Sequence, residues 1–327
     1  MFKRIVVATD RVLTRDAPVV SASRMARQQQ ARLYLLHVME SASVVNRRLI
    51  RHFESGEEMT ADPGYARRLG RALQQTYQDD LADIVHEVGI GTGFPWEEIL
   101  RWTKAVDSDL IVLGPHSTRA QEMGVVRVSG RIGSTAENVI TRETSPVMVV
   151  NRPAEPERLR FRRVLVAVDF SRSCECAVCF AARLAARCHS RLIVFHMLPV
   201  PPFPKYSRAD LIADEKQARR RLESFYEAYL DGLDHGYLIR AGAMPHLEIL
   251  DSAGKEDVDL IIMGSHTKET TGKWYPGSAV ERVGCRAACP LVVVTDPEVL
   301  THWQGTLTDA HREEKDRRIH VFQHQPS

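Results

Sequence analysis

The strongest constraint on the fold of this chain is an internal repeat. Six segments of the first half recur in the second half in the same order, with only the loops between them differing in length. The clearest match is RIVVATD at 4–10, which recurs as RVLVAVD at 163–169. The paired segments are 4–10 with 163–169, 35–38 with 194–197, 95–100 with 245–250, 109–114 with 259–264, 133–134 with 277–278, and 146–150 with 290–294. This pattern indicates a duplicated domain.

Each copy alternates short apolar runs with segments of helical length and pattern. We predict strands near 3–9, 32–38, 84–90, 109–114 and 146–150, then near 162–168, 191–197, 236–241, 259–264 and 290–295. We predict helices near 17–30, 64–80, 95–106 and 134–142, then near 173–188, 208–231, 245–254 and 278–287. Ser171 is a predicted N-cap, and Pro95 and Pro245 suit a first helical turn. The alternation predicts an α/β protein with two tandem Rossmann-like domains, each a doubly wound, five-stranded parallel sheet.

Boundaries follow from the repeat and from composition. We predict a first domain over 1–152, a linker over 153–160, a second domain over 161–296 and a charged tail over 297–327. The linker contains Pro153 and Pro156 among several charged residues, which is typical of an exposed boundary. The tail is rich in charge, His and Gln, and one helix within it is the most that we expect.

The stretch 257–282 carries the main functional signal. Its apolar run 260–263 reads as a buried strand that ends at Gly264, and after a polar loop Gly277 and Ser278 open a segment compatible with a helix. A strand, a loop bounded by glycines and a helix N-terminus together favour an anion, most often a phosphate. Ligands in doubly wound sheets bind beyond the carboxyl ends of the strands. Asp10, Val38 and Gly114, with their counterparts in the second copy Asp169, Met197 and Gly264, are predicted at such ends.

Composition narrows the class of partner. The chain has 327 residues, and its 44 Lys and Arg nearly balance its 42 Asp and Glu, which argues against a nucleic-acid partner. No apolar run reaches the length of a membrane span, and the first residues run straight into a predicted strand, without room for a signal peptide. The six cysteines all follow residue 170 at uneven spacing, unlike a secreted disulfide framework. We expect a cytoplasmic protein.

Taken together, these residues resemble the universal stress protein family over residues 1–296. The family's nucleotide-binding members carry Gly, two residues, Gly, nine residues, then Gly and Ser or Thr. The second copy matches this spacing with Gly264, Thr267, Gly277 and Ser278, but Thr267 replaces the second glycine. The first copy has Gly114 and Ser117, then a longer loop before Gly133 and Ser134. Thr is poorly suited to a left-handed backbone, although its hydroxyl can donate to phosphate.

The resemblance implies an adenine nucleotide, ATP, ADP or AMP, with Mg²⁺ as a candidate companion, held mainly by the second domain. The residues that it implies are Asp169, Met197, Met263, Gly264, Thr267, Gly277, Ser278 and Ala279, with Asp10, Val38, Gly114, Ser117, Gly133 and Ser134 in the first domain. It also implies an intramolecular pseudo-dimer through the final strands 146–150 and 290–294. A further homodimer and an unidentified protein partner stay open.

Three functions remain in competition on the sequence. The first is a nucleotide-dependent sensor or regulator of a stress response. The second is a scaffold that binds no nucleotide, and the third is a weak ATPase, although the sequence shows no carboxylate dyad, no Ser-His-Asp arrangement and no P-loop lysine. Cys174, Cys176 and Cys179 are interpreted as small buried residues of one helix rather than as metal ligands. His37 and His196 are interpreted as structural.

Overall fold

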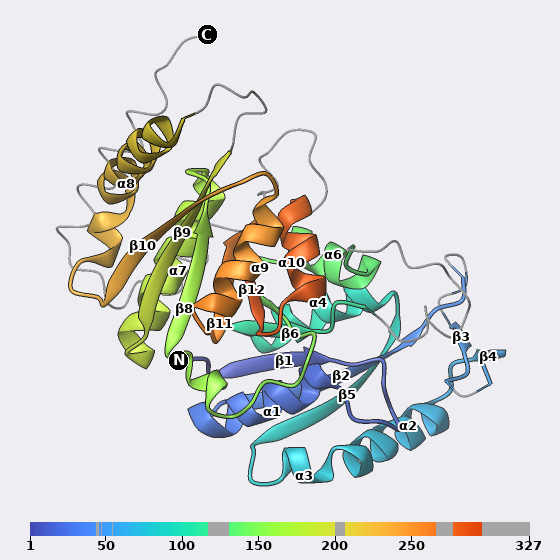
Figure 1. Cartoon of the computed structure of the whole chain (residues 1–327). Helices are drawn as coiled ribbons and strands as arrows, with labels where there is room; N and C mark the ends of the chain where they lie inside the picture. The colour runs from blue at the N-terminus through green and yellow to red at the C-terminus, as the bar shows by residue number, and fades with distance from the viewer. Residues whose placement is uncertain are drawn as a thin grey trace.

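A computed structural model describes residues 1–43, 46, 48–53, 55–116, 131–199, 207–265 and 277–295. Its two halves repeat one arrangement of strands and helices and share a single sheet (Figure 1). The predicted tail over 297–327 lies outside the described residues. Both halves are Rossmann-like, which confirms the predicted fold class.

The first half alternates strands and helices as its sequence pattern predicts. Its strands are β1 (Arg4–Ala8), β2 (Arg32–Glu40), β3 (Leu49–Arg51), β4 (Glu58–Thr60), β5 (His86–Gly93), β6 (Leu110–Leu113) and β7 (Val147–Val149). Its helices are α1 (Ala17–Gln29), α2 (Pro63–Thr76), α3 (Gln78–Leu81), α4 (Pro95–Val106) and α6 (Ser134–Arg142). A short 3-10 helix, η1 (Arg158–Arg160), connects the halves.

The second half follows the same order. Its strands are β8 (Arg163–Val168), β9 (Arg191–Pro199), β10 (His235–Gly242), β11 (Leu260–Gly264) and β12 (Leu291–Val294). Its helices are α7 (Arg172–Cys188), α8 (Arg208–Leu230), α9 (Pro245–Lys255) and α10 (Ser278–Arg286). Ser171 caps α7 by accepting a hydrogen bond from the Cys174 amide, and Pro95 and Pro245 begin their helices, all as predicted.

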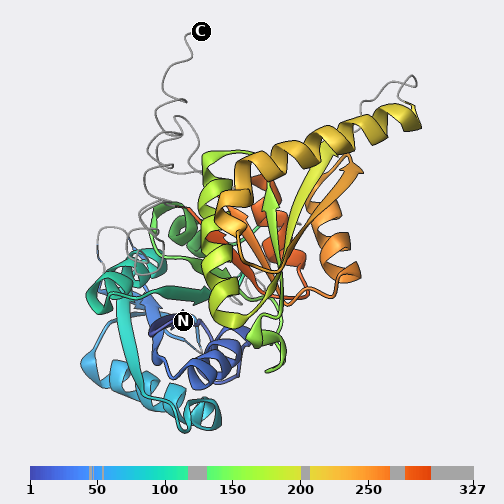
Figure 2. The same ribbon diagram turned by 90° about the vertical axis from the view of Figure 1, so that its left-hand side faces the viewer.

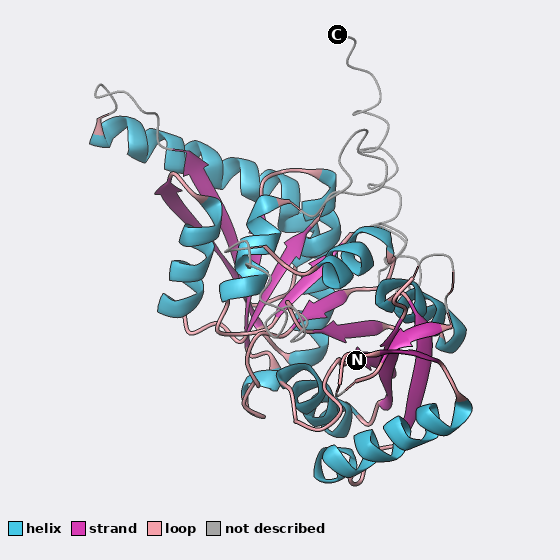
Figure 3. Cartoon of the chain, turned by 90° about the vertical axis from the view of Figure 1, so that its right-hand side faces the viewer, coloured by secondary structure: helices cyan, strands magenta, loops and turns pink. Residues whose placement is uncertain are grey.

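One sheet of ten strands crosses the whole molecule, in the order β10-β9-β8-β11-β12-β7-β6-β1-β2-β5 (Figure 3). Its strands pair in parallel within each half, and β12 pairs antiparallel with β7 where the halves meet. In that junction Val292 lies opposite Met148, and both are buried. The predicted pairing of the final strands is therefore confirmed, and it leaves neither strand as an open edge.

Helices cover both faces of this sheet and enclose two cores. One core is formed with α1, α2, α3, α7 and α8, and the other with α4, α6, α9 and α10. Each core contains residues from both halves, so the halves are packed as one unit. The N-terminal part of α8 projects past the sheet, and Ile212 there is exposed (Figure 2).

Two features differ from the sequence-based predictions. The hairpin β3–β4, with Leu49 opposite Thr60, was not predicted, because each strand has only three residues and shows no clear alternation. The predicted linker is exposed only in part. Ala154 and Leu159 are buried, and Arg24 and Ser21 of α1 hydrogen-bond the backbone of Ala154 at 2.7 and 3.1 Å.

Candidate functional site

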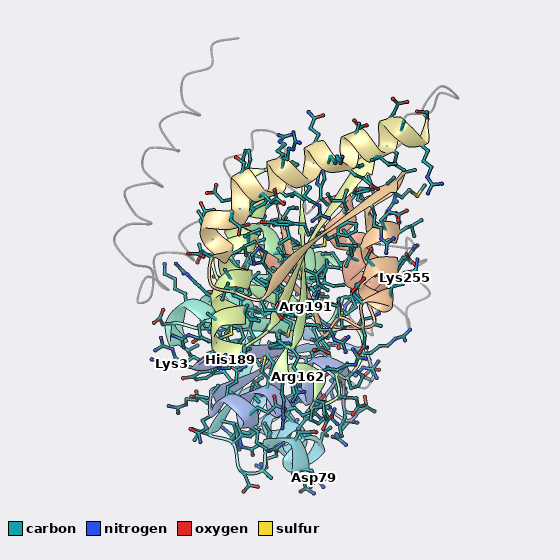
Figure 4. All side chains as sticks on the ribbon, turned by 60° about the vertical axis from the view of Figure 1, so that its left-hand side comes forward. Lys3, Asp79, Arg162, His189, Arg191 and Lys255 are labelled. Carbon is teal, nitrogen blue, oxygen red and sulfur yellow. The ribbon has the colours of Figure 1, made fainter. Side chains whose placement is uncertain are left out.

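Three of the predicted site residues lie at the carboxyl ends of adjacent strands in the second half. β8 lies between β9 and β11, and the chain passes from β8 to one neighbour and later returns to the other, which makes this the switch point of the strand order. Asp169 follows β8, Met197 lies near the end of β9 and Gly264 ends β11. Figure 4 labels Arg162, His189 and Arg191, which lie where β8 and β9 begin, at the opposite ends of these strands.

Asp169 is exposed at this edge of the sheet, and the thiol of Cys174 donates a hydrogen bond to its carboxylate. Its Oδ1 accepts hydrogen bonds from the Ser171 amide at 3.0 Å and from the Cys174 thiol at 3.0 Å. Burial, and then the charge of Asp169, raise the pKa of Cys174 to about 12, so the thiol stays protonated and donates. Cys174 was interpreted only as a small buried residue. Nothing in its spacing distinguishes it from Cys176 and Cys179, which are buried as predicted.

Two equivalent histidines, His37 and His196, form hydrogen bonds between neighbouring strands beside the site. Nδ1 of His196 lies 2.9 Å from the carbonyl oxygen of Val168, and Nδ1 of His37 lies 3.0 Å from that of Thr9. Because a carbonyl oxygen accepts, each Nδ1 carries the proton. His196 therefore links β9 to the end of β8, and His37 links β2 to the residue that follows β1. These contacts agree with the structural role that the sequence indicated.

Gly264 and Gly114 hold equivalent positions but have different surroundings. A Cβ on Gly264 would lie 2.3 Å from the carbonyl oxygen of Ser173 and 2.7 Å from the amide nitrogen of Cys174, both backbone atoms at the start of α7. A Cβ on Gly114 would meet Pro18 only at 3.5 Å, an ordinary contact. Glycine at 264 is therefore required by the packing of α7 against β11, whatever its role toward a ligand.

The helices that would face a phosphate begin at glycines with ordinary backbone angles. Gly277 precedes α10 with φ −55°, and Gly133 precedes α6 with φ −68°. Ser278 and Ser134 are exposed in the first turns that follow. Ala279 and Met197 both pack against the same core, as does Val38 in the first half, while Met263 is buried in it. The site therefore has an apolar floor beside a polar helix N-terminus.

Part of both predicted phosphate loops lies outside the described residues. Ser117 belongs to 117–130, and Thr267 belongs to 266–276. The first loop is described as far as His116, whose Nε2 lies 3.5 Å from the sulfur of Cys285 in α10. The start of the first loop therefore touches the last helix of the second half.

The equivalent positions of the first half have different neighbouring segments. Five residues lie between Asp10 and the N-cap Asp16, whereas only Phe170 lies between Asp169 and the N-cap Ser171. The hairpin β3–β4 joins the end of β2 through a bridge between Ser41 and Ile50. It brings the Phe53 ring to 6.4 Å from His37, in an edge arrangement. The hairpin therefore covers the side of β2 where His37 is buried, whereas Val38 packs against the core on the other face of the sheet.

Asp16 gives a pH-dependent prediction. Burial is the main reason that its pKa rises to about 6, and the charge of nearby Asp10 adds to this. Because the folded state binds this proton more tightly, the associated stability is present below about pH 4 and is lost as pH rises through 6. The free energy of unfolding of the wild type, minus that of Asp16→Asn, should fall by about 2 kcal/mol between pH 4 and pH 7. Asn retains the N-cap. Urea denaturation at several pH values measures this difference, and a constant value would contradict the prediction.

Membrane-spanning helices and metal clusters are both absent from the described residues. No helix among them is long and apolar enough to cross a membrane. No group of three or more His, Cys, Asp and Glu side chains in the described part of the chain could hold a metal ion.

Comparisons with known proteins agree with the repeat and the fold. The sequence profile of the universal stress protein family matches residues 1–151 and again residues 160–295. A universal stress protein of Mycolicibacterium smegmatis is 25% identical over 302 residues, covering 89% of this chain and 96% of the relative. One of Thermus aquaticus is 29% identical over 139 residues, 41% of this chain and 98% of the relative. The crystal structure of a universal stress protein from Archaeoglobus fulgidus shares the fold, with a TM-score of 0.58 and 18% identity over 89% of this chain and 96% of that one.

Proposed function

This chain belongs to the universal stress protein family in its tandem form, and on that premise we propose that its second domain binds an adenine nucleotide. Binding of ATP, ADP or AMP would change a surface of the protein. Partner proteins in a stress response would recognise that change. The observation that supports this proposal is that Met197, Asp169 and Gly264 lie at the carboxyl ends of the adjacent strands β9, β8 and β11, beside the switch point, and that α10 is the next helix described after β11.

Different residues at this edge would bind the base and the phosphates of the nucleotide. Asp169, exposed and oriented by Cys174, would accept a hydrogen bond from the exocyclic amine of adenine. Met197 and Ala279 would supply an apolar floor for the base. The first amides of α10 and the Ser278 hydroxyl would donate to phosphate oxygens, where the helix dipole also favours negative charge. Thr267 would add a hydroxyl, and ATP would bring Mg²⁺ to its phosphates.

One difference between the halves favours the second domain. Only Phe170 lies between Asp169 and Ser171, the N-cap of α7, whereas five residues lie between Asp10 and Asp16, the N-cap of α1. We assign the first domain's Asp10, Gly114, Gly133 and Ser134 a structural role, with weaker or no binding.

Cell compartment and chemistry follow as further parts of the proposal. We place the protein in the cytoplasm, because all six cysteines are free thiols. We assign no catalytic residue, since hydrolysis of ATP needs a positioned base for the attacking water and none is identified among the residues described at this edge.

A paired substitution tests the assignment to the second domain. Gly277→Val should weaken nucleotide binding by roughly 100-fold or more, because a branched side chain would stand where the phosphate approaches the helix. Its φ of −55° suits valine, so the fold should survive. Gly133→Val is the matched control in the first domain and should leave affinity unchanged. Denaturing the purified wild type and separating the supernatant by anion exchange should release adenine nucleotide. Equal affinity in both variants would move the site elsewhere.

A further inference from the structure

We propose that the hydroxyl of Ser265 binds a phosphate oxygen in the second domain, together with the N-terminus of α10. Ser265 directly follows Gly264, the last residue of β11, and it is not one of the residues that the sequence predicts for the site. The source of the phosphate is the nucleotide of the proposed function, on which this assignment rests. The assignment adds a binding residue and a physical reason for the difference between the two domains.

Ser265 is a buried polar side chain without a hydrogen-bond partner. Its exposed fraction is 2%, and its Oγ makes no hydrogen bond with any residue in the described part of the chain. An unpaired hydroxyl in the interior costs free energy, because it has lost its hydrogen bonds to water without replacing them. Buried polar groups are normally paired, so this hydroxyl indicates a partner from outside the chain.

The geometry of β11 directs the Ser265 side chain toward α10. The Ser265 N–H donates to the carbonyl oxygen of Val294 at 3.0 Å, so the pairing with β12 continues through this residue. Side chains alternate between the two faces along a strand. A Cβ on Gly264 would meet the start of α7, whereas Met263 lies in the core that contains residues of α10. Ser265 therefore faces the side of the sheet that α9 and α10 cover (Figure 1).

The first domain shows how near this position lies to the helix N-terminus. The repeat places Pro115 where the second domain has Ser265, and Gly133 where it has Gly277. The Gly133 N–H donates to the carbonyl oxygen of Pro115 at 2.7 Å. The residue after the strand and the N-cap glycine of the helix are therefore in direct contact in that domain. From this equivalence we place Ser265 beside the N-terminus of α10.

The same contact differs between the domains in its hydrogen-bonding groups. Within the described residues no hydrogen bond is made by the Gly277 N–H, whereas that of Gly133 is used by Pro115. Proline also has neither a hydroxyl nor a backbone N–H, so Pro115 offers an anion no donor. The first domain thus uses its glycine N–H within the protein, while the second presents an N–H and a hydroxyl at the equivalent place.

A phosphate oxygen is the acceptor that these groups fit. The N–H groups at a helix N-terminus and the helix dipole favour negative charge, and a serine hydroxyl can donate to the same anion. Rotation about χ1 can turn Oγ toward the site without moving the backbone. The acid in the first turn of α10, Glu281, pairs with Arg131 at 3.7 Å, so its charge is countered within the protein. The unpaired hydroxyl therefore destabilises the free protein and stabilises its complex with phosphate.

Ser265→Ala should have two opposite effects. Removing the unpaired hydroxyl should raise the Tm of nucleotide-free protein by about 2 °C. It should also weaken AMP binding by about ten-fold, as for the loss of one hydrogen bond to a charged acceptor. Adenosine, which has no phosphate, should bind the variant and the wild type equally. Titration calorimetry measures the affinities, and scanning calorimetry measures Tm.

Ser252→Ala is the matched control. Ser252 is fully buried, and its Oγ also lacks a hydrogen-bond partner in the described residues. It lies in the last turn of α9, which leads into the start of β11, and so at the opposite edge of the sheet from the site. This variant should also raise Tm, but its affinity for AMP should equal that of the wild type.

The possible results separate this assignment from the proposed function. If the wild type binds AMP and Ser265→Ala binds it equally well, Ser265 has no role and its partner is a buried water only. A loss of affinity as large for adenosine as for AMP would also overturn the assignment, because the contact would not be with phosphate.

A wild type that binds neither AMP nor adenosine would contradict the proposed function, and inorganic phosphate then becomes the probe, at ionic strength held constant with sodium chloride. A Tm raised by phosphate in the wild type and in Ser252→Ala, but not in Ser265→Ala, would support the anion site without a nucleotide. No rise in the wild type would overturn the site as well.

Discussion

Gly264→Ala should destabilise the second domain by about 3 kcal/mol, as expected when a methyl group is forced into a fully packed contact. The added Cβ would lie 2.3 Å from the carbonyl oxygen of Ser173 and 2.4 Å from its carbonyl carbon. These are backbone atoms of the first turn of α7, so no side-chain rotation can relieve the overlap. β11 and α7 would have to separate, and both belong to the core of the second half.

Gly114→Ala is the control, because it changes the equivalent residue of the first domain. Its Cβ would find its nearest neighbours at 3.5 Å, which needs no movement. We expect a change within about 1 kcal/mol, since removing a glycine also lowers the entropy of the unfolded chain. Urea denaturation followed by circular dichroism measures both variants. Equal stability of the two would show that the close approach of α7 to β11 is wrong.

Met148→Asp should be the most damaging change at the junction of the halves. Met148 is fully buried in β7, opposite Val292 of β12. A carboxyl group there would lose its hydration without gaining a partner, at a cost of about 4 kcal/mol or more. Because each core contains residues of both halves, we expect both halves to unfold together, in a single transition at lower denaturant.

Met148→Leu separates the effect of charge from that of shape. This substitution nearly conserves volume and should cost less than about 1.5 kcal/mol. Denaturation of both variants should be followed with one probe in each half. A Met148→Asp variant as stable as Met148→Leu, or two separate transitions in the wild type, would contradict the shared sheet and core.

Much of the fold could be predicted because its strands are buried on both faces. The runs that became β6 and β11 are apolar without alternation, which is the pattern of a central parallel strand. Because the two halves repeat, an element predicted in one half was supported by the matching segment of the other half. The hairpin β3–β4 was not predicted, because its second strand is largely exposed and no counterpart is found in the part of the second copy that the structure describes.

The candidate site was predictable in its outline but not in its contacts. The order of strands places Asp169, Met197 and Gly264 at one edge, and the sequence alone indicated this. The thiol of Cys174 on Asp169 was not visible in the sequence, because the contact depends on how α7 meets the end of β8. The packing role of Gly264 was hidden for the same reason, since a motif position shows that glycine is present but not what approaches it.

We propose that the second domain holds the main nucleotide-binding site of the chain. Isothermal titration calorimetry of ATP and AMP into protein stripped of bound nucleotide tests it most directly. We predict binding in the micromolar range, about 8 kcal/mol of binding free energy, with a stoichiometry of one nucleotide per chain. The absence of heat with both nucleotides, or a stoichiometry of two equivalent sites per chain, would contradict this account.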